Sequence, residues 1–130
     1  MVEQGRRTGV QGFVTGDLDF KLFDVVVVPF PFTNRTAAKR RPALVVSSAA
    51  FNSASRHSVL AMITSAEQSR WPGDLPISDL LSAGLASDCL VRLKIFTLDQ
   101  RLIVRRAGTL AATDQKSLRS SWKTLLLTSS

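Results

Sequence analysis

Short apolar runs separated by polar stretches predict strands along most of the chain. Residues 24–30 read DVVVVPF, and four consecutive valines closed by a proline are typical of a strand buried on both faces. Similar runs predict further strands at 42–48, 59–64, 75–77, 89–97 and 101–106. Polar stretches predict loops at 31–40 and 65–73, and Gly108 and Thr109 predict a bend.

The period of the pattern changes near the C-terminus. Apolar residues recur there at i, i+4, i+7 and i+8, namely Leu118, Trp122, Leu125 and Leu126. This spacing predicts one face of an amphipathic helix. Thr113 is suited to cap it, and Asp114 is suited to the positive end of its dipole. The whole pattern therefore predicts a mainly β fold, with five or six short strands followed by one packing helix.

Length and composition favour one globular domain. The chain has 130 residues and is 45% apolar, so it can bury a core without disulfides or structural metal ions. We expect residues 1–19, which are rich in glycine, to be a tail outside the fold, and 20–130 to form the domain. No apolar stretch matches a membrane span or a signal peptide, so we expect a cytoplasmic protein with no membrane partner. The single cysteine, Cys89, and the single histidine predict neither a metal site nor a cofactor.

The chain is basic, with a net charge of +7, which favours binding to a polyanion such as nucleic acid. Four cations gather in the loop before the second strand: Arg35, Lys39, Arg40 and Arg41. A second group lies within 92–106, where five cations accompany one acid, Asp99. Whether the two groups share one face is left open by the sequence.

Two neighbouring features are candidates for gripping a phosphate. Pro42 holds Arg41 in an extended conformation, which presets its fork-shaped guanidinium. Thr64 and Ser65 follow an apolar run and can donate hydrogen bonds to a phosphate oxygen, although a strand-end turn is the favoured interpretation when they are taken alone. The remaining loop cations, Arg35, Lys39 and Arg40, are electrostatic guides or a solvated loop.

Aromatic residues in loops are candidate platforms for the bases of a single-stranded nucleic acid. Phe32 and Trp71 are the two candidates, and Trp71 is also suited to cover the barrel. Three other aromatic residues are predicted to lie in the core: Phe51, Phe96 and Trp122.

Polar residues near the later strands have two interpretations each. Lys94 alternates with Arg92 along a strand, so the pair either lines a groove for nucleic acid or faces solvent. Asp99 either orients a cation or reads a base, or it forms a turn. His57 is interpreted as a surface histidine.

Six ordered segments resemble the PemK/MazF toxins of type II toxin–antitoxin systems. They are DVVVVPFPFT, KRRPALVVSS, AFN, LAMITS, GDLPI and VRLKIFTLDQRLI, which follow the family's order over about residues 21–127. The resemblance implies an SH3-like β-barrel of five to seven strands with a C-terminal helix, usually a homodimer. It also implies a metal-independent endoribonuclease, an mRNA interferase, which cuts single-stranded RNA and is bound by an acidic segment of a cognate antitoxin.

The resemblance assigns the catalytic pair to Arg41 and Thr64, with Ser65 next to the threonine as in many relatives. The substrate's 2′-hydroxyl would be the nucleophile, and Arg41 would stabilise the phosphorane. No residue is identified as the general base. The family usually has glycine where this chain has Phe23, and this departure bears on RNA access and antitoxin docking.

Two other functions remain open from the residues. One is a barrel that binds nucleic acid without cutting it. The other is a gyrase-inhibiting toxin of the CcdB type, which the plain packing helix at the C-terminus disfavours.

Overall fold

The computed structural model describes residues 19–30, 39–67 and 70–126. Its strands are β1 (Asp24–Phe30), β2 (Lys39–Val45), β3 (His57–Ser65), β4 (Leu75–Pro76), β5 (Cys89–Asp99) and β6 (Arg105–Thr109). Its helices are α1 (Ala49–Ser55), α2 (Leu80–Ala83) and α3 (Ala112–Leu125), with a short 3₁₀ helix at Gln100–Leu102. Most of the expected tail, residues 1–18, lies outside the described residues.

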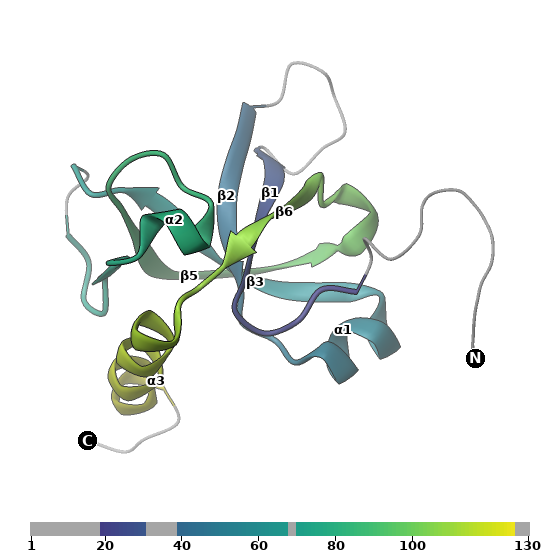
Figure 1. The fold of residues 1–130 in the computed structure, drawn as a ribbon. Helices are drawn as coiled ribbons and strands as arrows, with labels where there is room; N and C mark the ends of the chain where they lie inside the picture. The colour runs from purple at the N-terminus through teal and green to yellow at the C-terminus, as the bar shows by residue number, and fades with distance from the viewer. Residues whose placement is uncertain (1–18, 31–38, 68–69, 127–130) are drawn as a thin grey trace.

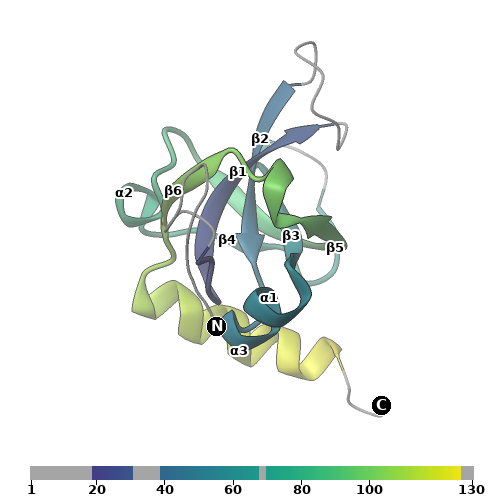
Figure 2. The ribbon, with the colours of Figure 1, turned by 90° about the vertical axis from the view of Figure 1, so that its right-hand side faces the viewer.

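The strands form one six-stranded sheet in the order β4-β5-β3-β2-β1-β6, and every neighbouring pair is antiparallel. The sheet curls into a half-barrel, with α3 lying across one end of it (Figures 1 and 2). The predicted mainly β, SH3-like barrel with a C-terminal helix is therefore confirmed.

The valine run of β1 is buried on both faces, as predicted, because the half-barrel has a core on each side of this strand. Val25 packs into the core under α3, which includes Leu118 and Trp122. Val26 and Val28 belong to a second core, which also includes Leu60. Alternate burial of successive valines explains why the run has no polar position.

The predicted C-terminal helix is present, but its start differs from the prediction. Ala111 is the N-cap residue and makes no side-chain cap, so Thr113 is not the cap. Asp114 lies in the first turn, as expected, and is buried. Its carboxylate accepts hydrogen bonds from the backbone N–H groups of Ser78 and Asp79 at 3.0 Å, and one from the Ser78 hydroxyl at 2.6 Å. The first turn of α3 is thus fixed by a distant loop.

Two short helices were not predicted, and one predicted core residue is exposed. Helix α1 begins after Ser48, whose hydroxyl oxygen accepts a hydrogen bond from the Phe51 N–H at 3.2 Å. Asn52 takes the inward position of this helix, and its amide donates to the Phe20 carbonyl at 2.9 Å. Phe51 therefore faces outward and is 45% exposed, which corrects its assignment to the core. Trp122 is buried as predicted, and Phe96 is partly buried against the second core.

The predicted strand at 101–106 is wrong in its first half. Arg101 lies in the 3₁₀ helix, whose N-cap residue is Asp99, and β6 begins only at Arg105. Gly108 and Thr109 belong to β6 instead of forming a bend. Hydrophobicity alone indicated a strand at Leu102 and Ile103. The chain instead forms a 3₁₀ helix there, because Asp99 caps its start.

Phe23 occupies a backbone conformation that normally belongs to glycine. Its φ is +75°, while its N–H donates to the Val45 carbonyl at 2.8 Å and its carbonyl accepts from the Leu110 N–H at 2.9 Å. The ring is buried, with the Arg119 guanidinium 4.9 Å from its centroid. The residue is strained, but its side chain fills the core beneath α3.

Candidate active site

Arg41 lies inside a strand and not at the end of a loop. Strand β2 begins at Lys39, three residues earlier than predicted, and pairs Arg41 with Val28 of β1. Successive strand residues point to opposite faces, so Lys39 and Arg41 share one face and Arg40 points to the other. All three cations are exposed, which leaves their charges accessible to a polyanion.

Thr64 and Ser65 end β3, where they pair with β5 at Leu90 and Cys89 respectively. Thr64 is half-buried and Ser65 is exposed. The Ser65 hydroxyl oxygen accepts a hydrogen bond from the Glu67 N–H at 3.2 Å, which is the strand-end turn that the sequence also indicated. The hydroxyl proton of Ser65 remains able to donate to a ligand, because the turn uses only its oxygen.

The register of β2 and β3 brings Arg41 and Thr64 to the same face of the sheet. The ladder between these antiparallel strands runs from Val45 opposite Leu60 to Ala43 opposite Met62. Arg41 and Thr64 each lie two residues past this last pair, and residues two apart share a face. Beyond the pair the strands separate, with β2 rising to the top of Figure 1 and β3 running to its left. Arg41 and Thr64 thus lie on the diverging ends of the two strands, and we call this divergence the opening between β2 and β3.

A cluster of cations around Trp71 lies beside this opening. The Arg92 guanidinium lies 5.0 Å from the centre of the Trp71 ring, and the Lys94 ammonium lies 5.9 Å from it. Both side chains come from an irregular part of β5, where the register with β3 shifts between Ala61 and Ile63. The expectation that Lys94 and Arg92 share a face agrees with their common contact. Trp71 itself is 43% exposed.

Asp74 and Arg92 form a nearly buried ion pair that the sequence pattern did not predict. Arg92 donates from Nε to one carboxylate oxygen at 3.1 Å and from Nη2 to the other at 2.9 Å, and the Asp74 side chain is only 2% exposed. The hydrogen bond from Arg92 lowers the pKa of Asp74, although burial opposes this effect. The turn-forming sequence WPGD was the only signal for this pair, because the two residues are far apart in the chain.

Asp99 lies away from the opening. It pairs with His57, the first residue of β3, and therefore stands about 23 Å from Thr64 along that strand. Its carboxylate is bound to the Arg101 guanidinium at 2.7 Å and accepts from the Arg101 N–H at 2.9 Å. These hydrogen bonds from Arg101 lower the pKa of Asp99 to about 2. The structure thus gives Asp99 the turn-forming role that the sequence left open, and does not bring it to Arg41 and Thr64.

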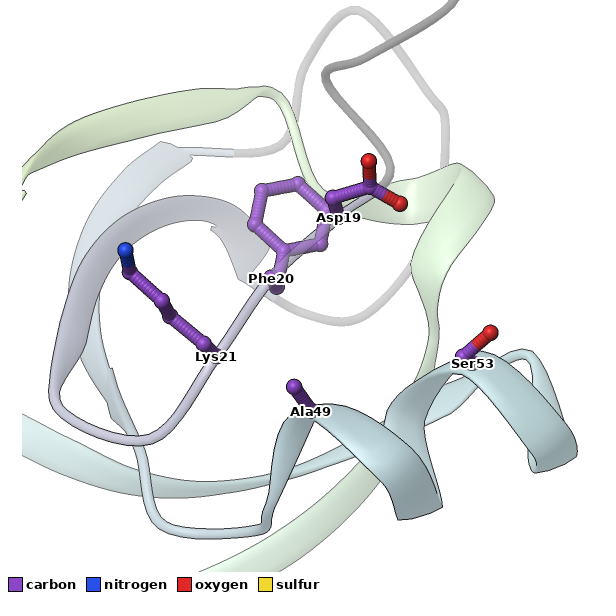
Figure 3. Close-up of a pocket in the computed structure, with 5 residues that line it drawn as sticks. All are labelled: Asp19, Phe20, Lys21, Ala49 and Ser53. Carbon is purple, nitrogen blue, oxygen red and sulfur yellow. The ribbon is translucent and has the colours of Figure 1, made fainter.

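Several other features complete the description. Phe32 and Arg35 lie outside the described residues. A cavity of about 320 Å³ lies between α1 and the segment before β1, as Figure 3 shows. It is lined by Asp19, Phe20, Lys21, Ala49 and Ser53, none of which is a predicted site residue.

Among the described residues, no group of three or more His, Cys, Asp or Glu side chains could hold a metal ion. No helix in this part of the chain is long and apolar enough to cross a membrane.

Fold and site together define a class of protein: a small basic half-barrel with a C-terminal helix, in which exposed cations lie where two strands diverge. Residues 21–126 match the family model of the PemK-like, MazF-like toxin of type II toxin–antitoxin systems. The match covers more than half of the chain, and the chain belongs to this family.

Several solved structures have the same fold. A MazE–MazF complex from Deinococcus radiodurans is 23% identical, with a TM-score of 0.65, and the match covers 87% of this chain and 100% of that one. An endoribonuclease in complex with its cognate antitoxin, from a mycobacterial species, is 15% identical, with a TM-score of 0.62 over 83% of this chain and 93% of that one. The Mycobacterium tuberculosis toxin MazF-mt6 is 17% identical, with a TM-score of 0.62 over 78% and 93%. A search of curated proteins returned no match.

Proposed function

We propose that this toxin-family chain is a metal-independent endoribonuclease that cuts single-stranded RNA at the opening between β2 and β3. The observation that carries the proposal is the placement of Arg41 and Thr64 on one face of the sheet, each two residues past the last pair of the ladder. A similar structure is described as an endoribonuclease, which supports the same reaction class. The net charge of +7 suits a substrate that is a polyanion.

The proposed reaction uses the substrate's own 2′-hydroxyl. Its oxygen forms a bond to the adjacent phosphorus and loses its proton, while the bond from phosphorus to the 5′-oxygen breaks and that oxygen gains a proton. The products are a 2′,3′-cyclic phosphate and a 5′-hydroxyl. No base is assigned among the residues of the chain.

Two side chains have roles that follow from their chemistry. The Arg41 guanidinium stays positively charged and can donate two parallel hydrogen bonds to phosphoryl oxygens, so it stabilises the charge of the phosphorane. The Thr64 hydroxyl donates one further hydrogen bond to the same group. Lys39 shares the face of Arg41 and guides the backbone of the RNA. Arg40 and Ser65 point to the opposite face from Arg41 and Thr64, so they are assigned only a contribution to RNA that passes the strand ends.

The proposed partners are single-stranded RNA, a cognate antitoxin and a second copy of the chain in a homodimer. One similar structure is a complex of MazE with MazF, and another is a complex of an endoribonuclease with its cognate antitoxin. An acidic, extended antitoxin segment would cover the same cationic opening and so compete with RNA.

Incubation of the pure protein with single-stranded RNA in EDTA tests this function. We expect fragments with 5′-hydroxyl ends, and a loss of cutting of at least about 100-fold in Arg41→Ala, as for removal of a transition-state donor. Arg101→Ala is the matched control, because that arginine is 84% exposed and lies at the opposite end of β3. RNA binding without fragments would favour the non-catalytic barrel, and gyrase inhibition without fragments would favour the CcdB-type toxin.

A further inference from the structure

We propose that Trp71 forms a base-stacking subsite for one nucleotide of a single-stranded nucleic acid, held in position by the Asp74–Arg92 ion pair and completed by Lys94. The subsite deepens the proposed function and rests on it for the location of the substrate, since it lies beside the opening between β2 and β3. Asp74 and Arg92 are positioning residues in this proposal, and Trp71 and Lys94 contact the nucleic acid.

The backbone of Trp71 is fixed by a closed turn. Its N–H donates to Asp74 Oδ2 at 2.8 Å, and its carbonyl accepts from the Asp74 N–H at 3.1 Å. The same Asp74 carboxylate is held by Arg92 from β5. One carboxylate therefore ties the turn to the sheet, at a point where it is shielded from water.

Helix α3 supports the turn from a second direction. The Trp122 indole N–H donates to the Gly73 carbonyl at 3.2 Å, and the Leu125 side chain covers the Cα of Gly73. Gly73 has a φ of +85°, which the bend of the turn requires. The turn is thus built as a rigid support, so little conformational freedom is lost when a ligand binds to it.

The ring of Trp71 is supported but not covered. Arg92 and Lys94 reach it from a single strand, two residues apart, at 5.0 Å and 5.9 Å from the ring centre. With 43% of the residue exposed, the indole keeps an accessible surface, unlike Trp122, which is 6% exposed. An exposed indole next to cations matches the needs of a single strand, which offers flat bases and negative phosphates in alternation.

The arginine of the subsite lies near Thr64 in the sheet, because Thr64 pairs with Leu90, two residues before Arg92. Val91 precedes Arg92 and pairs with Ile63, the residue before Thr64. A nucleotide stacked on Trp71 would therefore lie close to one whose phosphate is at Thr64. This proximity to Thr64 supports the assignment of the subsite to the same substrate as the candidate catalytic pair.

The test compares two uncleavable probes that carry the same number of phosphates: a single-stranded thymidine 12-mer of DNA and a fully abasic 12-mer. We expect the wild-type chain to bind the thymidine probe more tightly, by about 5-fold or more, because stacking contributes about 1–3 kcal/mol per base. Trp71→Ala should remove most of this difference, and Trp71→Phe should keep most of it. Phe51→Ala, a matched loss of an aromatic residue that is 45% exposed on α1, should leave it unchanged. An undiminished preference in Trp71→Ala overturns the subsite.

Asp74→Asn tests the positioning role with a readout that general destabilisation would not produce. We expect the preference for the thymidine probe to fall while binding of the abasic probe stays at the wild-type level; an equal loss for both probes would contradict the positioning role. The DNA probes lack the 2′-hydroxyl, so this test does not depend on cleavage. If RNA is not cut but the preference depends on Trp71, the nuclease fails and the subsite stands. If RNA is cut and the preference does not depend on Trp71, the nuclease stands and the subsite fails.

Discussion

At position 23 the glycine variant should be more stable than the alanine variant, which inverts the usual order of stability. At most positions alanine is more stable than glycine, because glycine loses more backbone freedom on folding. Phe23, however, has a φ of +75° in the left-handed region, where any residue with a Cβ is strained by about 1–2 kcal/mol. Phe23→Ala keeps this strain and Phe23→Gly relieves it, while both lose the same buried ring.

The magnitudes follow from these contributions. Loss of the buried ring should destabilise either variant by about 3–5 kcal/mol before strain is considered. The relief of strain, less a backbone entropy cost of about 0.5–1 kcal/mol, should leave Phe23→Gly more stable than Phe23→Ala by about 0.5–1 kcal/mol. Equilibrium unfolding in urea measures both free energies of unfolding.

A control in a right-handed helix should show the usual order. Lys116 is exposed in α3, and there the glycine variant should be less stable than the alanine variant by about 1 kcal/mol. An alanine variant at Phe23 as stable as the glycine variant, or more stable, would refute the reasoning from backbone strain.

Three further predictions concern other parts of the fold. The pKa of Asp114 is lowered because hydrogen bonds from Ser78 and the backbone outweigh the opposing effect of burial, so its contribution to stability is present above about pH 4 and is lost as the pH falls through its folded pKa. The difference in the free energy of unfolding between wild type and Asp114→Asn should therefore shrink as urea titrations move from about pH 5 to about pH 2. In NMR titrations the Asp99 carboxyl should show a pKa of about 2, and Arg101→Gln should raise it. Gly84→Ala should lower the Tm more than Gly73→Ala, because the added Cβ would meet rigid backbone at Ala107 in one case and the flexible end of Leu125 in the other.

Hydrophobic period predicted the parts of the fold that burial controls. The valine run became a strand buried on both faces, and the i, i+4 spacing of Leu118 and Trp122 became the buried side of α3. The register between strands cannot be predicted from local sequence patterns. The placement of Arg41 and Thr64 on one face could therefore be recognised only from the structure.

Polar side-chain contacts, both local and between residues far apart in the sequence, account for most of what the sequence did not predict. Helix α1 is stabilised by the buried amide of Asn52, and the 3₁₀ helix after β5 is capped by Asp99. The Asp74–Arg92 pair joins residues that are 18 positions apart, so neither residue stood out alone. The glycine-like conformation of Phe23 was indicated only by the resemblance to a family that usually has glycine there.

The most direct test of the account is a double-mutant cycle on the rate of RNA cleavage, using wild type, Arg41→Ala, Thr64→Ala and the double variant. Two groups that act on one phosphate are expected to be coupled, so the double variant should lose much less activity than the product of the two single losses. Single variants that cut RNA at the wild-type rate, or losses that multiply independently, would contradict a shared phosphate site at the opening between β2 and β3.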